Sequence, residues 1–561
     1  VKQIIKPGKY RVIASRGMEY TIAISDITVT AGQETKQDFS LERVIDTKGY
    51  VSADFHVHSA RSNDTSLPLE DRVGSYVAEN VEVIVSTDHN YITDFAPVLR
   101  KMAVDRLTKS IVGEEITTNL PNPVFPDGFG HHNVFPLPVV PFEARRGAVN
   151  SEYVPAATFY DRANLLSPGV KKVFQLNHAR AGIMGTGGLV TGGVFTTVKF
   201  DPTKPITTNP QLLLGSQLGT TTRNIDFNAI ELYNGDSVGL FQVLRNDWIS
   251  LINQGFFRTA TAVSDSHRLV IDAPGFPRSY VGVPTEDISA LKDEMIAESV
   301  IAGNVLGTSG PYIQFDIEGK PMGSLVDKRK GKVTLNIVVS APAWVPVEEV
   351  RILENGKQIM RFDATTNPRV TPAPSDPTAN TGQERFKASI KVKPKKDAYY
   401  IVEAGTKLPA IADTNGDGVV DRGDTNADGK IDANDRGFVQ PPAPAIYSMI
   451  APDFVPLAFT NPIFVDRNKN GKFDPPGLPK PANEPLEKQV IEQEDLHEHS
   501  GYFHDVKVDL PAVQEFLESL PEVTRKLVKP IEPIKNNRQT SNKQTFNNGW
   551  VSRIFNWFLS E

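Results

Sequence analysis

Three features are missing from this sequence, and each absence narrows the chemistry. The chain has no cysteine, so disulfides, thiolate metal sites and cysteine nucleophiles are all excluded. It has no run of 18 apolar residues, so no membrane-spanning helix is predicted. It has no excess of positive charge, because 60 Lys and Arg face 67 Asp and Glu, so we expect no nucleic-acid partner. Any bound metal must be held by His, Asp, Glu and water.

The length and composition predict several folded domains. The chain has 561 residues, of which 39% are hydrophobic and 23% charged, an ordinary globular balance. Residues 1–47 have the pattern of three or four short strands, which cannot bury two faces alone. Since the chain begins with Val1, we expect this partial β domain to end a longer N-terminal region or to lean on the next domain. Residues 489–561 are predicted to form a polar tail that ends in a short amphipathic helix.

Residues 48–312 have the pattern of a mixed α/β domain. Short apolar runs alternate there with helical patterns at 69–79 and 286–303, which favours a parallel sheet or a βα barrel. Two stretches rich in Pro, Gly and Thr, 119–168 and 181–225, are expected to form long loops on that scaffold.

Residues 313–488 have a different, strand-rich pattern. Hydrophobic and polar residues alternate in "KVTLNIVV" and again in "RFKASIKVK". Asn355-Gly356 stands between two strand-like runs, which predicts a hairpin turn. This region is therefore predicted to be a β-sandwich.

The positions of the histidines are the most informative feature. Seven of ten lie between residues 56 and 267, and nearly all follow an apolar strand-like run. In a βα barrel the carboxyl ends of the strands meet at one mouth, so such side chains would converge. The two imidazoles of an H-x-H pair on a strand also share one face. The residues placed in this way are His56, His58, Asp88, His89, Glu115, His178, Asp265 and His267.

The side-chain types indicate which metals such a mouth would hold. Imidazole and carboxylate without sulfur suit Zn, Mn or Fe. A carboxylate such as Glu115 can bridge two ions. The alternative, that these are separate buried or surface histidines, would require several coincidences within one span of 212 residues. The sequence therefore predicts a metal cluster.

The order of these motifs resembles a known family. "DFHVHSARSND", "STDHN", "GEEITT", "GHHNVFPL", "NHAR", "AIELYNG" and "SDSHR" follow one another as in the polymerase and histidinol phosphatase (PHP) superfamily. "PGKYRVIASRG", "GFPRSYVGVP" and "AFTNPIFVDRNKNGKFDPPG" are similar to the branch that includes carbaryl-type carbamate hydrolases. The resemblance covers most of residues 1–480. It implies an α/β fold, with a distorted (β/α)7 barrel of the PHP type flanked by β-sandwich-like domains.

The resemblance also implies a ligand set for two or three divalent ions at the barrel mouth. Asp64 stands where some relatives have His, which puts the occupancy of the third site in question. In the order of the three ions, the implied ligands are His56, His58, Glu115 and Asp265; Glu115, His131 and His178; and Asp64, His89 and His267.

Two of these assignments involve a choice between neighbours. The G-x-E-I-T pattern favours Glu115 over Glu114, and the G-H-x-N pattern favours His131 over His132. Asp88 is expected to orient a ligand or its strand rather than to bind a metal.

The charges at the mouth favour an anionic substrate or transition state. Three divalent ions would outweigh the three carboxylates of the implied ligand set, and water activated by metal would attack an ester centre without a Ser or Cys nucleophile. Arg180 and Arg268 are candidates for contact with a phosphate or oxyanion, as are Arg61 and Arg278, although an ordinary ion pair fits each of them equally well. Glu231 fits either support of a ligand or a buried structural role.

Residues 413–435 resemble two calcium loops of the dockerin type. Oxygen ligands at positions 1, 3, 5, 9 and 12, with Gly at position 6, suit a hard cation, and the alternative is a loop of Asx turns without an ion. A third run at 466–474 lacks the acid at position 12. The predicted calcium ligands are Asp413, Asn415, Asp417, Asp421, Asp424, Asn426, Asp428, Asp432 and Asp435.

These observations predict an exported, extracytoplasmic and bacterial metal-dependent hydrolase with a small anionic or ester substrate. Cleavage of a phosphoester is the first expectation, and cleavage of a carbamate or carboxylic ester is the second. A non-catalytic cell-surface binding or scaffold protein is the third. The terminal helix could dock on its own protein or contact a membrane surface peripherally. His497, His499 and His504 are expected to lie in a solvated acidic segment, with an accessory metal site as the alternative.

Overall fold

The computed structural model describes most of the chain up to residue 478. The chain divides into two compact units, Val1–Asn483 and Glu484–Glu561, and every described residue belongs to the first. The predicted terminal helix and the three C-terminal histidines lie outside the described residues. The described ranges are 3–118, 129–180, 193–269 and 272–478.

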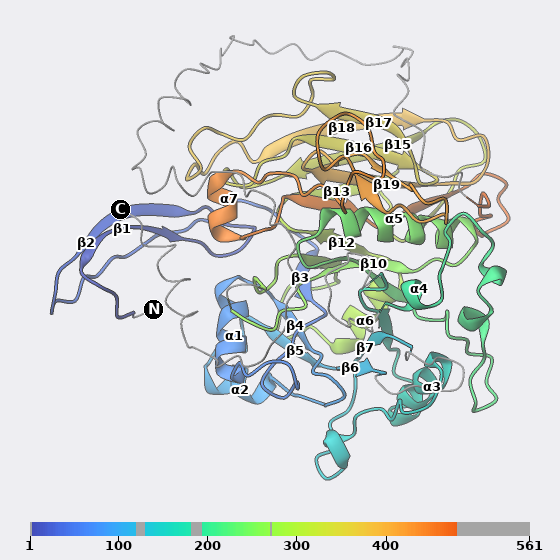
Figure 1. Cartoon of the computed structure of the whole chain (residues 1–561), viewed down its shortest axis with the longest axis horizontal. Coiled ribbons are helices and arrows are strands. Elements are labelled where there is room, and N and C mark those ends of the chain that lie inside the picture. Colours follow the sequence, from blue (N-terminus) through green and yellow to red (C-terminus); the bar gives the residue numbers. More distant parts are fainter. Residues whose placement is uncertain (1–2, 119–128, 181–192, 270–271, 479–561) are drawn as a thin grey trace, which may run out of the picture. The chain divides into compact units, whose positions relative to one another are not determined.

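Ten strands between Tyr50 and Thr308 belong to two sheets (Figure 1). Their bounds are β3 (Tyr50–Asp54), β4 (Val83–Ser86), β5 (Lys109–Val112), β6 (Glu114–Thr117), β7 (His131–Phe135), β8 (Val173–Leu176), β9 (Ala229–Asn234), β10 (Thr259–Val263), β11 (Arg278–Gly282) and β12 (Val305–Thr308). One sheet has the order β10-β9-β8-β7-β6, and the other includes the path β12-β11-β3-β4-β5. The strands β3, β4 and β5 are parallel to one another, as are β8, β9 and β10.

Seven α-helices accompany the described strands. They are α1 (Leu69–Ala78), α2 (Ala96–Lys101), α3 (Ala156–Leu166), α4 (Val194–Thr197), α5 (Val238–Asn253), α6 (Asp293–Ile301) and α7 (Ala445–Ile450). The helix predicted at 69–79 is confirmed, because α1 buries Val73 and Tyr76 on one face. The helix predicted at 286–303 is shorter than expected, since α6 begins at Asp293.

The α/β class is confirmed, but no closed (β/α)7 barrel is found among the described residues. The strand β7 runs antiparallel to both β6 and β8, which interrupts the parallel pattern. The chain passes from β5 to β6 at Gly113, where an added Cβ would lie 2.7 Å from the carbonyl oxygen of Val134. Single bridges, Val57 to Ser266 and His89 to Glu115, link the two sheets near the ends of their strands.

The expectation of long loops over 119–168 and 181–225 is wrong in part. Within the described residues the first stretch contains β7 and α3, and both elements are largely buried. The high Pro and Gly content around these elements hid their apolar periodicity, which is short in β7 and interrupted by polar residues in α3. Residues 119–128 and 181–192 lie outside the described part of the chain.

The region after β12 consists mainly of strands. Its bounds are β13 (Tyr312–Ile317), β14 (Leu325–Asp327), β15 (Val333–Ser340), β16 (Glu349–Glu354), β17 (Lys357–Asp363), β18 (Glu384–Val392), β19 (Ala398–Gly405), β20 (Ile411–Ala412), β21 (Arg422–Gly423), β22 (Leu457–Thr460) and β23 (Ile463–Asp466). The alternation predicted for β15 is confirmed, since Val333, Leu335, Ile337 and Val339 are buried. The predicted hairpin joins β16 to β17, with positive φ at Asn355 and Gly356.

Two layers of this region share one hydrophobic core. The three-stranded sheet β13-β15-β18 supplies Phe315, Ile337 and Phe386, and the larger sheet supplies Ile352 and Val402. The predicted boundary between a barrel and a β-sandwich lies near residue 312. One sheet continues across that position, and the division into two domains stays a prediction. The strand β12 pairs with β11 on one side and with β22 on the other.

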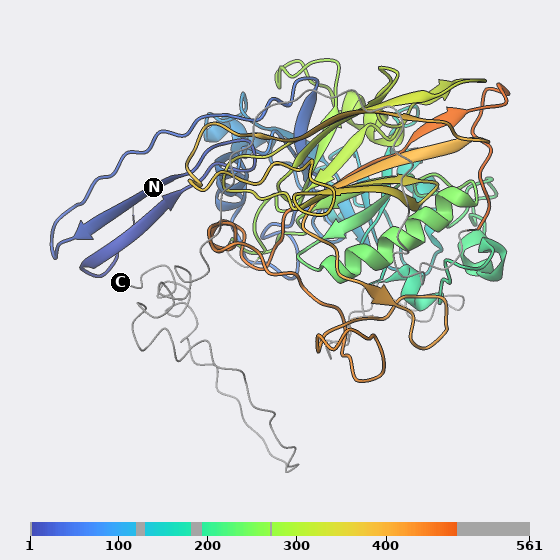
Figure 2. The ribbon, with the colours of Figure 1, turned by 90° about the horizontal axis from the view of Figure 1, so that it is seen from above.

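A two-stranded ribbon precedes these sheets. The strands β1 (Gly8–Ala14) and β2 (Ala23–Val29) pair in antiparallel register, and the predicted strand at "KQDFSL" is absent. Both views show the ribbon projecting from the other described strands (Figures 1 and 2). None of the described helices is long and apolar enough to cross a membrane.

Asn461 lies in the predicted β-sandwich and connects the two sheets through hydrogen bonds to β10 and β12 in the predicted barrel. This buried side chain accepts a hydrogen bond from the Ala260 N–H in β10 and donates to the carbonyl oxygens of Ala260 and Val305, all at 2.8 Å. The N–H and the carbonyl oxygen of Ala260 would lose this partner if the amide were removed, whereas the carbonyl oxygen of Val305 would keep the backbone N–H of Asn461 at 3.3 Å.

We expect Asn461→Ala to lower the free energy of unfolding by about 3 kcal/mol, because it leaves buried backbone groups unsatisfied. Chemical denaturation of the whole chain measures the loss. The matched control is Asn380→Ala, since Asn380 is exposed and bonds to Glu42 at the surface. A loss no larger than that of the control would contradict the bridging role.

Glu82 should make stability depend on pH. Its carboxylate accepts hydrogen bonds from Ser52, and burial together with the nearby Glu19 raises the pKa of Glu82 to about 6. Because this pKa lies above the value of an unfolded glutamate, the stabilising contribution is complete below about pH 4.5 and is lost as the pH rises through 6. We expect the Tm of Glu82→Gln to rise relative to wild type over that interval. The exposed Glu143→Gln should show no such trend.

Candidate metal centre

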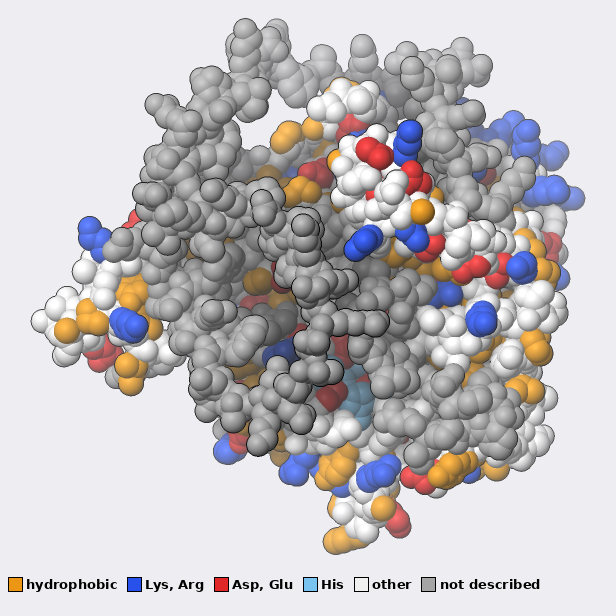
Figure 3. Space-filling view, viewed as in Figure 1, with side chains coloured by type: hydrophobic (Ala, Val, Ile, Leu, Met, Phe, Trp, Pro, Cys, Tyr) orange, Lys and Arg blue, Asp and Glu red, His pale blue; other side chains and the backbone are white. Residues whose placement is uncertain are grey.

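The predicted metal ligands lie at or just beyond the ends of strands in both sheets. His56 and His58 follow β3, His89 follows β4, and Asp265 and His267 follow β10. Because β3 and β4 are parallel and Val57 bridges Ser266 in parallel, these segments end on the same side. Figure 3 shows pale blue His side chains beside red carboxylates in the lower middle of the view. The structure thus brings together residues more than 200 positions apart.

The Glu115 carboxylate lies at the centre of the cluster. It is buried in β6, and five imidazoles each place a ring nitrogen between 2.7 and 3.5 Å from one of its oxygens. This arrangement fits a carboxylate that bridges two cations, the role that the sequence resemblance implies. The five histidines are His56, His58, His89, His131 and His178.

Asp265 faces the imidazole rings of His56 and His58. Its Oδ1 lies 3.1 Å from His56 Nε2 and 3.2 Å from His58 Nε2. Asp265 and His178 adopt positive φ, 49° and 27°, which is a strained conformation for residues other than glycine. Strain of this kind persists where the surroundings fix a residue, so the contacts around both residues hold them in place.

Asp64 forms a third and more open group. Its Oδ2 lies 2.9 Å from His89 Nε2 and 2.8 Å from His267 Nε2. The Asp64 side chain is 39% exposed, whereas those of His56 and His58 are fully buried. The cluster therefore has a closed side at β3 and an open side at Asp64 and His267.

The donor atoms fit divalent cations. Two atoms that each lie about 2.1 Å from one metal are about 3 to 3.5 Å apart, and the N···O separations above fall close to that range. Three groups, one around Asp64 and two around Glu115, have ligand atoms within 4.8 Å of one another. Within the described part of the chain, four of the predicted ligand atoms are buried without a hydrogen-bond partner, which is costly unless a cation completes them. These atoms are His56 Nε2, His58 Nε2, Glu115 Oε2 and Asp265 Oδ1.

The electrostatics keep the carboxylates charged. Burial opposes ionisation of Glu115 and Asp265, but His56 and the other imidazoles lower the pKa of both carboxyl groups well below the usual range. Burial lowers the pKa of His58 to about 3, so that ring is neutral and keeps a lone pair. Burial also opposes charge on His89, but Glu115 and Asp64 raise its pKa to about 10. The carboxylates and the ring of His58 are therefore in the form that binds a divalent cation, whereas His89 would have to release a proton to bind one.

Several polar side chains hold the ligands in place. Glu231 Oε1 lies 2.5 Å from His56 Nδ1, and its Oε2 accepts the backbone N–H of His178 at 2.7 Å. Because Glu231 occupies Nδ1 of His56, Nε2 of that ring is directed at Glu115 and Asp265. Glu231 therefore contacts two predicted ligands, and its role as a support of those ligands stays a prediction.

Three further supporting residues were not predicted from the sequence. Ser62 Oγ lies 2.9 Å from His58 Nδ1, Thr117 Oγ1 lies 2.6 Å from His89 Nδ1, and Asn177 donates to Glu115 Oε1 at 2.9 Å. Each stands within four residues of a predicted ligand. That proximity was the one signal that could have identified them.

The neighbours that were rejected as ligands have other partners. Glu114 Oε1 accepts the backbone N–H of Val149, on the opposite face of β6 from Glu115. His132 bonds through Nε2 to the carbonyl oxygen of Phe129 and through Nδ1 to the Tyr160 hydroxyl. Both side chains are buried away from the cluster, so the preference for Glu115 and His131 agrees with the geometry.

Asp88 supports a loop and not a ligand side chain. Its carboxylate accepts hydrogen bonds from the Ser59 N–H at 2.6 Å, from the Ser59 hydroxyl at 2.7 Å, and from the Thr93 hydroxyl. Ser59 directly follows His58, so Asp88 fixes the segment that carries His56 and His58.

Of the four candidate arginines, two are buried and two are exposed. Arg180 is buried and forms a bidentate pair with Asp247, with both contacts at 2.7 Å. Arg278 is buried and donates to the carbonyl oxygens of Gly275 and Glu79. Arg268 is exposed beside Asp272, and Arg61 is also exposed. The structure therefore leaves Arg61 and Arg268 accessible to a substrate, while Arg180 and Arg278 are engaged in the protein interior.

The predicted calcium ligands lie in one segment around β20 and β21, where most of them are at least partly exposed and Asp435 is buried. Asp413 accepts hydrogen bonds from the backbone of Gly416 and Gly418, and Asp424 accepts from Asp428 and Gly429. These turns are the conformation that the calcium-loop pattern implies and also the one expected of Asx turns. Calcium binding at these residues stays a prediction.

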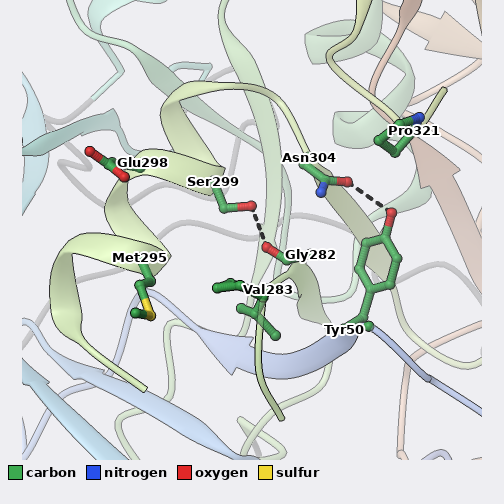
Figure 4. Close-up of a pocket in the computed structure, with 10 residues that line it drawn as sticks. Tyr50, Gly282, Val283, Met295, Glu298, Ser299, Asn304 and Pro321 are labelled. Atoms are coloured by element: carbon green, nitrogen blue, oxygen red, sulfur yellow. Dashed lines mark hydrogen bonds between the residues drawn. The ribbon is translucent and has the colours of Figure 1, made fainter. Parts of the chain in front are cut away.

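A surface pocket lies at the opposite end of β3 from the histidines (Figure 4). It has a volume of about 460 Å³, and Tyr50 donates a hydrogen bond to Asn304 Oδ1 across it at 2.8 Å. Met295 and Glu298 from α6 also line it. It contains none of the predicted ligands, so it is separate from the candidate metal centre.

Comparison with known proteins identifies no family for the chain. No family model matches, and no curated protein matches. Among solved structures, the chain is similar to a lesion-specific endonuclease from Pyrococcus furiosus, with a TM-score of 0.28 and 15% sequence identity. The match covers 45% of this chain and 56% of the endonuclease chain, so it spans little more than half of that protein. Similarity at this level does not define the fold or activity of the chain.

We expect Glu115→Gln to weaken Mn²⁺ binding by at least about 100-fold, since even partners outside the ligand shell contribute 10- to 100-fold. The substitution keeps the shape of the side chain and removes the charge that five imidazoles face. Titration calorimetry measures the affinity, and metal analysis gives the stoichiometry. The matched control is Glu114→Gln on the same strand, which should bind Mn²⁺ like wild type. Equal binding by both variants would refute the assignment.

Proposed function

We propose that this chain is a metal-dependent hydrolase that cleaves an ester bond. The observation that carries the proposal is the set of buried ligand atoms without hydrogen bonds around Glu115 and Asp265. Divalent cations supply Lewis acidity and lower the pKa of water in sites of this kind. Zn, Mn and Fe suit a donor set of imidazole and carboxylate.

The residues would divide into three ligand groups. His56 and His58 would bind through Nε2 with Glu115 and Asp265, His131 and His178 would share Glu115, and the open group would consist of Asp64, His89 and His267. Glu231 orients the ring of His56, and Asn177 orients the carboxylate of Glu115. The buried side of the cluster excludes bulk solvent, so a substrate would approach from the side of Asp64.

We favour a phosphoester as the substrate. A site with several cations neutralises the oxygens of a phosphoryl group, and Arg61 and Arg268 lie exposed near the open group. A carbamate or carboxylic ester is the second candidate. It is supported by the burial of Arg180 and Arg278, because their engagement leaves fewer cationic side chains for a phosphate.

The wider framework of the proposal comes from the sequence. Resemblance to the PHP superfamily supports a distorted (β/α)7 barrel at 48–312 with β domains on either side, and resemblance to the carbaryl-hydrolase branch supports the second substrate class. The calcium loops support an extracytoplasmic location, because millimolar calcium outside the cell suits loops of modest affinity.

Initial rates on aryl phosphate monoesters, aryl phosphate diesters and an aryl carbamate test the proposal with Mn²⁺- and Zn²⁺-loaded protein. We expect phosphoester turnover, and a loss of at least about 1,000-fold in His56→Ala, since loss of a metal ligand removes several kcal/mol of transition-state stabilisation. Glu114→Gln is the matched control and should keep its activity.

The outcomes separate the candidates. Turnover of the carbamate alone would assign the chain to the second substrate class. Metal-loaded protein that turns over none of the three ester classes would refute hydrolysis and favour the non-catalytic binding or scaffold protein.

A further inference from the structure

Three loops meet at one end of the strand-rich region. They comprise residues 328–332 after β14, 391–397 at the end of β18, and 466–474 at the end of β23. Arg467 Nη1 donates to the carbonyl oxygens of Lys328 and Gly331 at 2.6 and 3.2 Å. Asp397 accepts the backbone N–H groups of Arg467 and Asp474 at 2.8 and 2.9 Å. These bonds fix the three loops to one another as a single surface, which we call the basic end.

The basic end has a charge opposite to that of the whole chain. Together with Asp327, the three loops hold nine Lys and two Arg against four Asp. Even with all four acids ionised, positive side chains exceed negative ones by seven, and the acids Asp397 and Asp466 are buried and bond to backbone N–H groups. The rest of the chain has 49 Lys and Arg against 63 Asp and Glu. Figure 3 shows Lys and Arg side chains gathered at the upper right of the view.

Several of these cations are free to contact a partner. Arg329, Lys330, Lys393 and Lys395 are exposed, and none of them forms an ion pair with another described residue. Lysine predominates over arginine, which suits contact with charged headgroups as point charges and not bidentate recognition of one defined group. The one aromatic ring in the loops, that of Phe473, packs against Phe464 and Tyr399 and is not available for stacking.

We propose that the basic end binds the surface of an anionic lipid bilayer. A cluster of this size and lysine content is what such surfaces attract, at about fivefold in affinity per residue near the headgroups. The contact needs no apolar insertion, in keeping with the lack of a described spanning helix. The basic end includes none of the nine predicted metal ligands, so the inference does not depend on the proposed function.

A bilayer fits these observations better than a nucleic acid does. A nucleic acid follows an extended track of positive charge, often with aromatic rings for its bases. Here the cations are confined to loops beyond the ends of three strands, no ring is available, and the rest of the chain would repel a long polyanion. A flat bilayer contacts only one end of the protein, so only that end has to be positively charged.

Flotation of the full chain with vesicles tests the proposal. We compare vesicles of phosphatidylcholine with vesicles that also contain phosphatidylglycerol, at low and high salt, with and without a chelator to exclude bridging by calcium. We expect binding only to the anionic vesicles, weakened by salt and unchanged by the chelator. The test variant carries Arg329→Gln, Lys330→Gln, Lys393→Gln and Lys395→Gln, and should bind at least about 100-fold more weakly.

The matched control removes the same charge elsewhere. It carries Lys36→Gln, Arg106→Gln, Lys199→Gln and Lys292→Gln, all at exposed positions, and should lose less than about fivefold. Equal loss in both variants would show that net charge and not the basic end attracts the vesicles, and unchanged binding of the test variant would also overturn the proposal. Binding of duplex DNA through the four test residues, without binding to vesicles, would replace the bilayer by a nucleic acid. Equal Tm values for the three proteins exclude misfolding as a cause.

Discussion

The buried negative charge at Glu115 is the constraint on which the candidate site depends. A carboxylate taken out of water is costly unless it is compensated, and no Lys or Arg contacts this one among the described residues. Imidazoles surround it instead, and His56 and His58 leave buried Nε2 atoms without hydrogen bonds. A protein built only for stability would gain by replacing this group with apolar side chains. A divalent cation would compensate this charge, and the buried His and Glu side chains are grouped so that they could hold one.

The same need for fixed geometry accounts for how the two sheets are joined. The ligands come from both sheets, since His56 follows β3 while Glu115 lies in β6, so a small shift between the sheets would separate donors that must stay about 3 Å apart. The bridges at Val57 and His89 lie next to the ligands themselves. The side chain of Asn461 fixes β10 to β12 deeper in the same structure. The strand-rich region is thus part of the framework that holds the site, because β12 continues into it through β22.

Much of the candidate site could be predicted, because its residues follow strand ends that the sequence marks locally. Most of the other features depend on contacts between residues far apart in the sequence. A polar side chain just after an apolar strand marks the end of that strand, and His56, His178 and Asp265 were all found in this way. No local pattern in the sequence shows which residue a side chain will contact. Arg180 follows the same rule as His178, but its guanidinium turns to Asp247, 67 residues away. For the fold, alternation and helical periodicity located β15, β18 and α1. The antiparallel insertion of β7 was missed, because the direction of a strand leaves no trace in its own residues.

The distribution of charge separates two regions of the molecule. At the candidate metal centre, carboxylates are buried among imidazoles, so the attraction for a cation is local and directional. At the basic end, lysines stand in water on loops, where screening limits each to a weak interaction that becomes strong only in number. The net charge of −7 reveals neither the candidate metal centre nor the basic end, because it is a sum over the whole chain. A negative net charge therefore leaves room for one positive end. Such an end, set apart from the ligands, would hold the molecule at an anionic surface while the side of Asp64 stayed open to substrate.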